Sequence, residues 1–139
     1  MKTPLLLSVL LLLFSSTLSF AQNQMSVVGT WKLISGKATV GDSTMSYDNK
    51  TADAIKIVTP THFAVLYNNV ADSAFQNAGA GPVQFDDKNY TEELRYGNGK
   101  DWIGKKAKFT YRIEGDKWYI KGGIENVATF DEVWQRVSK

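Results

Sequence analysis

The sequence contains no cysteine and only one histidine. Disulfides, thiol nucleophiles and thiolate metal ligands are therefore excluded, and so is a metal site built from several histidines. The chain also lacks a charge excess, because 16 basic residues are set against 14 acidic ones. Nucleic-acid-binding proteins usually carry a clustered basic excess, so we do not expect nucleic acid as a partner. Helical periodicity is absent as well: after residue 21 no convincing amphipathic helix can be drawn.

The longest apolar run lies near the N-terminus and is typical of a cleaved export signal. Lys2 supplies a positive charge, residues 5–14 are almost wholly apolar, and residues 19–21 end in small side chains that suit a signal peptidase. A membrane anchor is the alternative, but the run is shorter than the roughly 20 residues that span a bilayer. We therefore expect a signal peptide over residues 1–21, no membrane span, and a secreted or periplasmic domain over residues 22–139.

The rest of the chain is patterned as short strands separated by turns. Apolar residues alternate with polar ones at a period of two, and many are β-branched or aromatic. Residues 68–80 lack this pattern, which leaves a mobile loop or a distorted strand, and residues 51–57 hold the best candidate for a helical turn. Turns about every 8–12 residues favour an antiparallel sandwich or barrel. The expected strands cover residues 27–40, 43–48, 54–59, 62–67, 83–85, 90–96, 105–113, 117–121 and 130–137.

Alternation within these strands turns ionisable side chains inward. Glu92 shares a face with Tyr90, Leu94 and Tyr96, and in the last strand Glu132, Trp134 and Arg136 share a face. Tyr111 and Trp118 also lie on inward faces. A buried ion without a partner costs several kcal/mol, so these groups must pair, meet water or bind a ligand. The pattern therefore predicts a cavity, and the alternative is a closed structural pair between a Glu and an Arg.

Two short motifs resemble the calycin group, which includes lipocalins and fatty-acid-binding proteins. Gly29-Thr30-Trp31 is similar to the Gly-x-Trp that opens the first lipocalin strand. Trp134-Gln135-Arg136 is similar to the segment that supplies an arginine packed across that tryptophan. The resemblance implies a barrel closed at one end by Trp31 and Arg136, since a guanidinium stacks well on an indole face.

The whole region after residue 21 resembles a family of small bacterial secreted lipocalin-like proteins. The resemblance implies an all-β fold: a single antiparallel up-and-down β-barrel of about eight to ten strands, lipocalin-like, with an interior cavity. An avidin-like barrel is the alternative, but the other motifs of that family are absent. The motifs, in chain order, are Gly-Thr-Trp-Lys-Leu at 29–33, Tyr-Thr-Glu at 90–92, Gly-Lys at 104–105, Ile-Glu-Gly-Asp at 113–116 and Glu-Val-Trp-x-Arg at 132–136.

We expect a binding protein rather than an enzyme, with a small hydrophobic or amphipathic ligand and with no cofactor or metal. One alternative is an interaction module of the cell envelope whose partner contacts loops such as residues 68–80. Another is an enzyme that uses Glu92 and His62 as acid and base, and a third is a haem protein with His62 as axial ligand. The candidate ligand-binding residues are His62, Tyr90, Glu92, Tyr111, Trp118, Glu132, Trp134 and Arg136.

Overall fold

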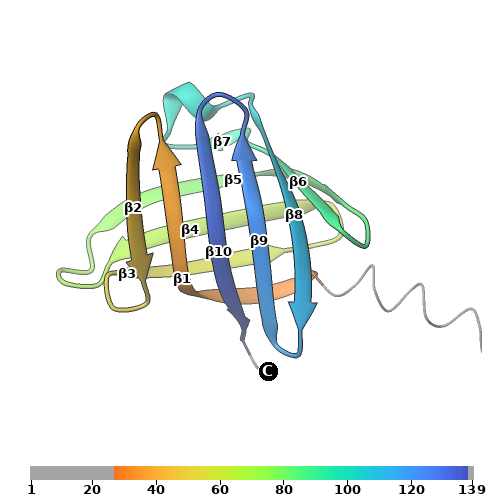
Figure 1. Cartoon of the computed structure of the whole chain (residues 1–139), viewed down its shortest axis with the longest axis horizontal. Coiled ribbons are helices and arrows are strands. Elements are labelled where there is room, and N and C mark those ends of the chain that lie inside the picture. The colour runs from red at the N-terminus through yellow and green to blue at the C-terminus, as the bar shows by residue number, and fades with distance from the viewer. Residues whose placement is uncertain (1–26, 138–139) are drawn as a thin grey trace, which may run out of the picture.

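Ten strands and one short 3₁₀ helix follow one another along residues 27–137, the part of the chain that the computed structural model describes (Figure 1). The expected signal peptide lies outside these residues. Within them no helix is long and apolar enough to cross a membrane. In chain order the elements are β1 (Gly29–Val40), β2 (Ser43–Asp48), β3 (Ala52–Val58), β4 (His62–Asn69), β5 (Phe75–Phe85), β6 (Asn89–Glu93), β7 (Tyr96–Gly97), η1 (Lys100–Trp102), β8 (Lys106–Glu114), β9 (Lys117–Ile124) and β10 (Ala128–Arg136).

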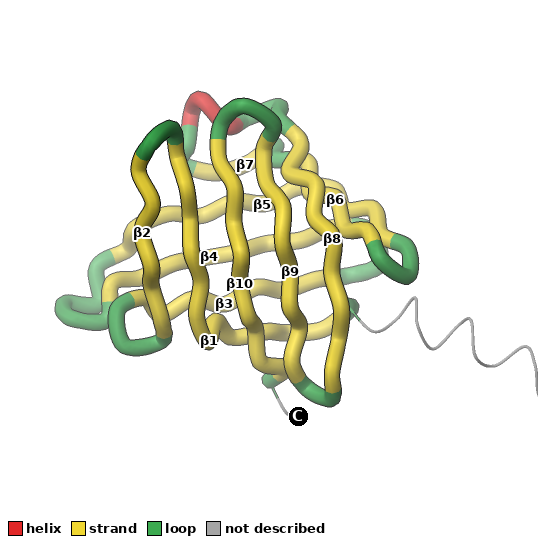
Figure 2. Tube along the Cα trace, in the orientation of Figure 1, coloured by secondary structure: helices red, strands yellow, loops and turns green. Residues whose placement is uncertain are grey.

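Eight strands form a closed ring in which each strand pairs antiparallel with the next. The order around the ring is β1-β3-β4-β5-β6-β8-β9-β10, and β10 pairs with β1 to close it. β2 pairs with β1, and β7 pairs with β5. In Figure 2, β2, β1, β10, β9 and β8 run across the front, and β3, β4 and β5 cross behind them at a steep angle. The ring confirms the expected all-β fold, a single up-and-down antiparallel barrel.

Strand β1 is shared between two neighbours because it bends halfway. Its first half pairs with β3 and its second half with β2, and its register against β10 shifts between Leu33 and Ser35. Gly36 follows this bulge, and a Cβ at Gly36 would lie 2.4 Å from the ring of Tyr47. The bend and the missing side chain therefore let the Tyr47 ring lie against the β1 backbone.

The strand predicted over residues 90–96 is interrupted. Val83 pairs with Glu92, but Ala80 pairs with Tyr96. An advance of three residues along β5 therefore corresponds to an advance of four residues on the opposite strand. This extra residue turns Tyr96 outward, where it is 69% exposed, and the prediction that Tyr96 points inward is wrong. Beyond Leu94 the chain leaves β8 and passes into η1 at one end of the barrel (Figure 1).

Three further segments decide between or correct the sequence interpretations. Of the two alternatives for residues 68–80, the strand is found in the second half, because residues 75–85 form one long strand, β5. Residues 51–57 lie largely in β3, in agreement with the strand expected over residues 54–59 and not with the helical turn. Residues 122–123 continue β9 instead of breaking it. In β5 and β9 the cause is glycine and alanine, which allow close backbone approach but carry no apolar periodicity. A Cβ at Gly81, for example, would lie only 1.9 Å from the carbonyl oxygen of Glu93.

One end of the barrel is filled by aromatic side chains. Trp31, Trp118 and Tyr90 have no exposed surface, and the ring centroid of Trp118 lies 5.2 Å from that of Trp31 and 5.0 Å from that of Tyr90. The Arg136 guanidinium stacks 4.1 Å above the Trp31 ring and donates to the Val28 carbonyl at 3.0 Å. This end is therefore solid, with the stacked arginine that the family resemblance implies.

Candidate functional site

The opposite half of the barrel encloses a cavity of about 660 Å³. Its wall is mainly apolar, and its buried charged groups, Lys56, Glu92 and Glu132, lie beside the aromatic end. Other polar side chains also line the cavity, namely Ser46, Thr51, Asn69, Gln76, Asn77 and Asn98. The apolar lining includes Ala38, Phe63, Val65, Leu94, Trp102, Phe109, Ile124 and Phe130. The polar floor, as we name it, consists of Tyr47, Lys56, Tyr67, Glu92 and Glu132.

Lys56 and Glu92 form a buried ion pair at the polar floor. The Lys56 ammonium lies 2.8 Å from Glu92 Oε1, and the two side chains are only 3% and 7% exposed. Four aromatic rings, those of Tyr90, Phe109, Trp118 and Trp134, surround the ammonium with centroids 5.1–5.9 Å away. The carboxylate and the ring faces together replace the water that the ammonium loses on burial.

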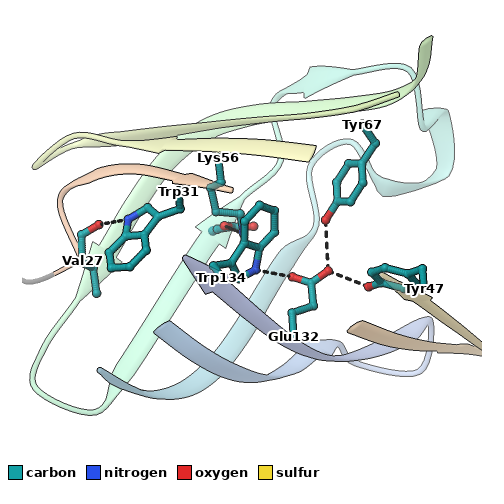
Figure 3. A network of polar contacts seen from close by, with 8 residues as sticks. Val27, Trp31, Tyr47, Lys56, Tyr67, Glu132 and Trp134 are labelled. Atoms are coloured by element: carbon teal, nitrogen blue, oxygen red, sulfur yellow. Dashed lines mark hydrogen bonds and ion pairs between the residues drawn. The ribbon is translucent and has the colours of Figure 1, made fainter. Parts of the chain in front are cut away.

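Glu132 is the second buried carboxylate, and its contacts are hydrogen-bond donors (Figure 3). Its Oε1 accepts from the hydroxyls of Tyr47 at 2.7 Å and Tyr67 at 3.1 Å, and its Oε2 accepts from the Trp134 indole at 3.0 Å. None of the basic side chains in residues 27–137 forms a salt bridge with it. Hydrogen bonds therefore stabilise this carboxylate without a cation.

The two phenols that bind Glu132 stay protonated. Burial raises the pKa of Tyr67 well above its usual value, and the negative charge of Glu132 raises it further. The pKa of Tyr47 is raised for the same two reasons. Both hydroxyls therefore remain donors across the physiological range, and they hold the carboxylate in one orientation.

Two of the eight predicted ligand-binding residues, Glu92 and Glu132, line the cavity. Tyr90, Trp118 and Trp134 are fully buried, and each contributes a ring to the surroundings of the Lys56 ammonium rather than to the cavity wall.

The remaining three predicted residues lie elsewhere. Tyr111 donates from its hydroxyl to the Asp86 carbonyl at 2.6 Å, close to the β5–β6 turn. Arg136 lies at the filled end over Trp31. His62 is exposed at the start of β4 and hydrogen bonds through Nδ1 to Thr61 at 2.9 Å. The structure thus does not bring His62 to the Lys56–Glu92 pair.

Three residues of the polar floor were missed by the sequence analysis: Tyr47, Lys56 and Tyr67. A signal for Tyr67 exists, because it follows Phe63 and Val65 at a spacing of two. The pattern around Lys56 is misleading, since it is flanked by two isoleucines that would be expected to take the inward face. In the structure Lys56 shares its face with buried alanines and with Val58.

No family model and no curated protein matches this chain. Among solved structures, the crystal structure of a point mutant of the fluorescent protein UnaG is similar, with 11% sequence identity and a TM-score of 0.42. The match covers 86% of this chain and 99% of that chain. At this level of similarity it says nothing about function, and the assignment of a closed barrel depends on the strand pairing described above.

Proposed function

We propose that this is an exported protein that binds a small, mostly apolar ligand inside its barrel. The observation that carries the binding proposal is the cavity of about 660 Å³, which has the volume, the apolar wall and the few convergent polar groups of a small-molecule site. Unfilled space lowers stability, so a barrel that served only as a scaffold would gain from larger side chains there. Export is supported by the pattern of residues 1–21, and a mature chain that begins at Gln22 in protein from the host would test it.

Apolar side chains also surround the mouth of the cavity. Val40, Met45 and Ile103 line the cavity and are 46%, 60% and 42% exposed. A ligand with an apolar body would meet these side chains before it enters, and its apolar surface would leave water in steps.

The state of the polar groups supports binding rather than catalysis. Glu92 is engaged by Lys56, and Glu132 accepts three hydrogen bonds from groups that are themselves held in place. An enzyme that uses Glu92 and His62 as acid and base needs both groups within reach of the substrate. His62, the proposed partner of Glu92 in an enzyme, is exposed.

A variant that fills the cavity tests the proposed function. Ala38→Trp places a large ring in the cavity, whereas Lys37→Trp places the same ring on the outer face of the same strand. We expect a neutral apolar fluorophore, N-phenyl-1-naphthylamine, to bind the wild type and Lys37→Trp equally. It should bind Ala38→Trp at least about tenfold more weakly, because the introduced indole ring replaces the contacts between the fluorophore and the cavity wall. Equal binding to all three folded proteins would place the ligand elsewhere and refute the proposal.

A protein-binding module is the second candidate, and one observation favours it. Val70 and Phe75, at the two ends of the turn between β4 and β5, are 41% and 57% exposed. A partner seated on this turn would be unaffected by Ala38→Trp. The same variant therefore separates a function of the interior from a function of the loops.

A further inference from the structure

We infer that the ligand carries a positively charged, hydrogen-bond-donating head group, such as a primary ammonium, and that Glu132 is its partner. This assignment deepens the ligand-binding function proposed above and depends on it. The ligand class is thus an amphipathic amine with an alkyl or aryl body, rather than a fatty acid.

The first reason is the balance of charge at the polar floor. Two carboxylates, Glu92 and Glu132, face one ammonium, Lys56. Because Lys56 lies 2.8 Å from Glu92, these two neutralise each other, and Glu132 is left without a counter-ion among the residues described. A carboxylate head would bring a third negative charge into a space where water screens poorly, whereas an ammonium would balance the second.

The second reason is the set of atoms that a head group would meet at Glu132. A carboxylate has about four lone-pair sites, and three of those on Glu132 are used by Tyr47, Tyr67 and Trp134. One acceptor site therefore remains on Oε2. Each of the two tyrosine hydroxyls already donates a hydrogen bond to Glu132, and its oxygen can still accept one. The free capacity at this point is acceptor capacity, which suits an N–H donor and offers nothing to a carboxylate.

Lys56 is the basic residue that lines the cavity, and it is poorly placed to attract an anion. Its side chain is 3% exposed, and four aromatic rings and Glu92 occupy its surroundings. An anion at Lys56 would have to compete with a carboxylate already 2.8 Å away.

Three probes with the same tail separate the head groups: decylamine, decanol and decanoic acid, each below its micelle concentration at neutral pH. Their affinities are measured by displacement of N-phenyl-1-naphthylamine and by calorimetry. We expect decylamine to bind at least about tenfold more tightly than decanol, as a charge-assisted hydrogen bond allows. Decanoic acid should bind more weakly than decanol.

Glu132→Gln tests the assigned partner, because it removes the charge and nearly preserves the shape of the side chain. We expect the preference for decylamine over decanol to fall to about twofold or less, with decanol affinity unchanged. Asp131→Asn is the matched control: it removes a neighbouring charge on β10 that is exposed and lies 3.6 Å from Lys121, and it should leave the preference intact.

The outcomes distinguish this inference from the proposed function. If decanoic acid binds best, or if Glu132→Gln keeps the full preference for the amine, the head-group assignment is wrong while a ligand-binding cavity stands. If none of the three probes binds and the fluorophore is not bound either, the proposed function itself fails. Should Glu132→Gln not fold, the ranking of the three probes on the wild-type protein still decides the matter.

Discussion

At the scale of single residues, Lys56 and Glu92 show what a local pattern can and cannot predict. Glu92 lies at a spacing of two from Tyr90 and Leu94, so its inward direction follows from alternation. Lys56 stands between Ile55 and Ile57, and the same rule would turn it outward. In the structure Lys56 points inward, and Ile57 is 42% exposed. The carboxylate that makes the burial of Lys56 tolerable belongs to Glu92, which lies 36 residues away along the chain on another strand. The local pattern around Lys56 therefore does not show it.

Removal of one partner of this pair should be far more harmful than removal of one partner of an exposed pair. Lys56→Met leaves Glu92 buried without its cation, and we expect a loss of about 3–5 kcal/mol in the free energy of unfolding. Lys32→Met, which breaks the exposed contact of Lys32 with Asp53 at 3.2 Å, should cost about 1 kcal/mol or less. Urea denaturation measures both values.

A second substitution checks the cause. In Lys56→Met with Glu92→Met both charges are gone, and most of the lost stability should return, since apolar replacements of a buried pair are often neutral. Equal losses for Lys56→Met and Lys32→Met would contradict the view that burial decides the energy of the pair.

At the scale of elements, the strands that were misread are those in which small residues allow neighbouring backbones to approach closely. β9 passes through Gly122 and Gly123, where the backbone of a neighbouring strand approaches too closely for a side chain. Sequence reasoning treats such a pair as a break, because glycine has no apolar face to show periodicity. The extra residue between β6 and β7 is equally silent in the sequence, although it decides that Tyr96 faces solvent.

Two glycine substitutions on the β8–β9 hairpin should differ sharply. A Cβ at Gly122 would lie 2.0 Å from the Lys108 carbonyl oxygen, so Gly122→Ala must push the two strands apart, and we expect a loss of about 2–4 kcal/mol. Gly115 in the turn has a φ of 59° but open space around it, so Gly115→Ala should cost only about 1–2 kcal/mol. Midpoints of urea unfolding at equal m values compare the two, and a larger loss for Gly115→Ala would contradict the close approach.

At the scale of the whole molecule, three tyrosines make the stability of the barrel depend on pH in the alkaline range. Burial raises the pKa values of Tyr47, Tyr67 and Tyr90, and the charge of Glu132 or Glu92 raises them further. Because the folded state holds these protons more tightly than the unfolded chain, their contribution is complete below about pH 10. It is lost progressively as the pH rises above that value.

We therefore expect cooperative alkaline unfolding. Each tyrosine that stays protonated in the folded state lowers the free energy of unfolding by about 1.4 kcal/mol per pH unit above pH 10. Phenolate absorbance of these three residues should appear together with the loss of β-sheet circular dichroism. Tyr67→Phe removes one such group and should make the decline less steep. Reversible ionisation of all six tyrosines in a folded barrel would contradict the prediction.

The sequence by itself determined the all-β character of the chain, the inward direction of Glu92 and Glu132 and, through the family resemblance, the residues Trp31 and Arg136 that meet at the filled end. Each of these follows from neighbours along one strand or from a short motif. Only the tertiary structure decided that Lys56 is the partner of Glu92, that Glu132 has donors but no cation among the described residues, and that space remains above them. The physical reason is that these contacts cross the barrel, so they depend on the register of every strand in the closed ring.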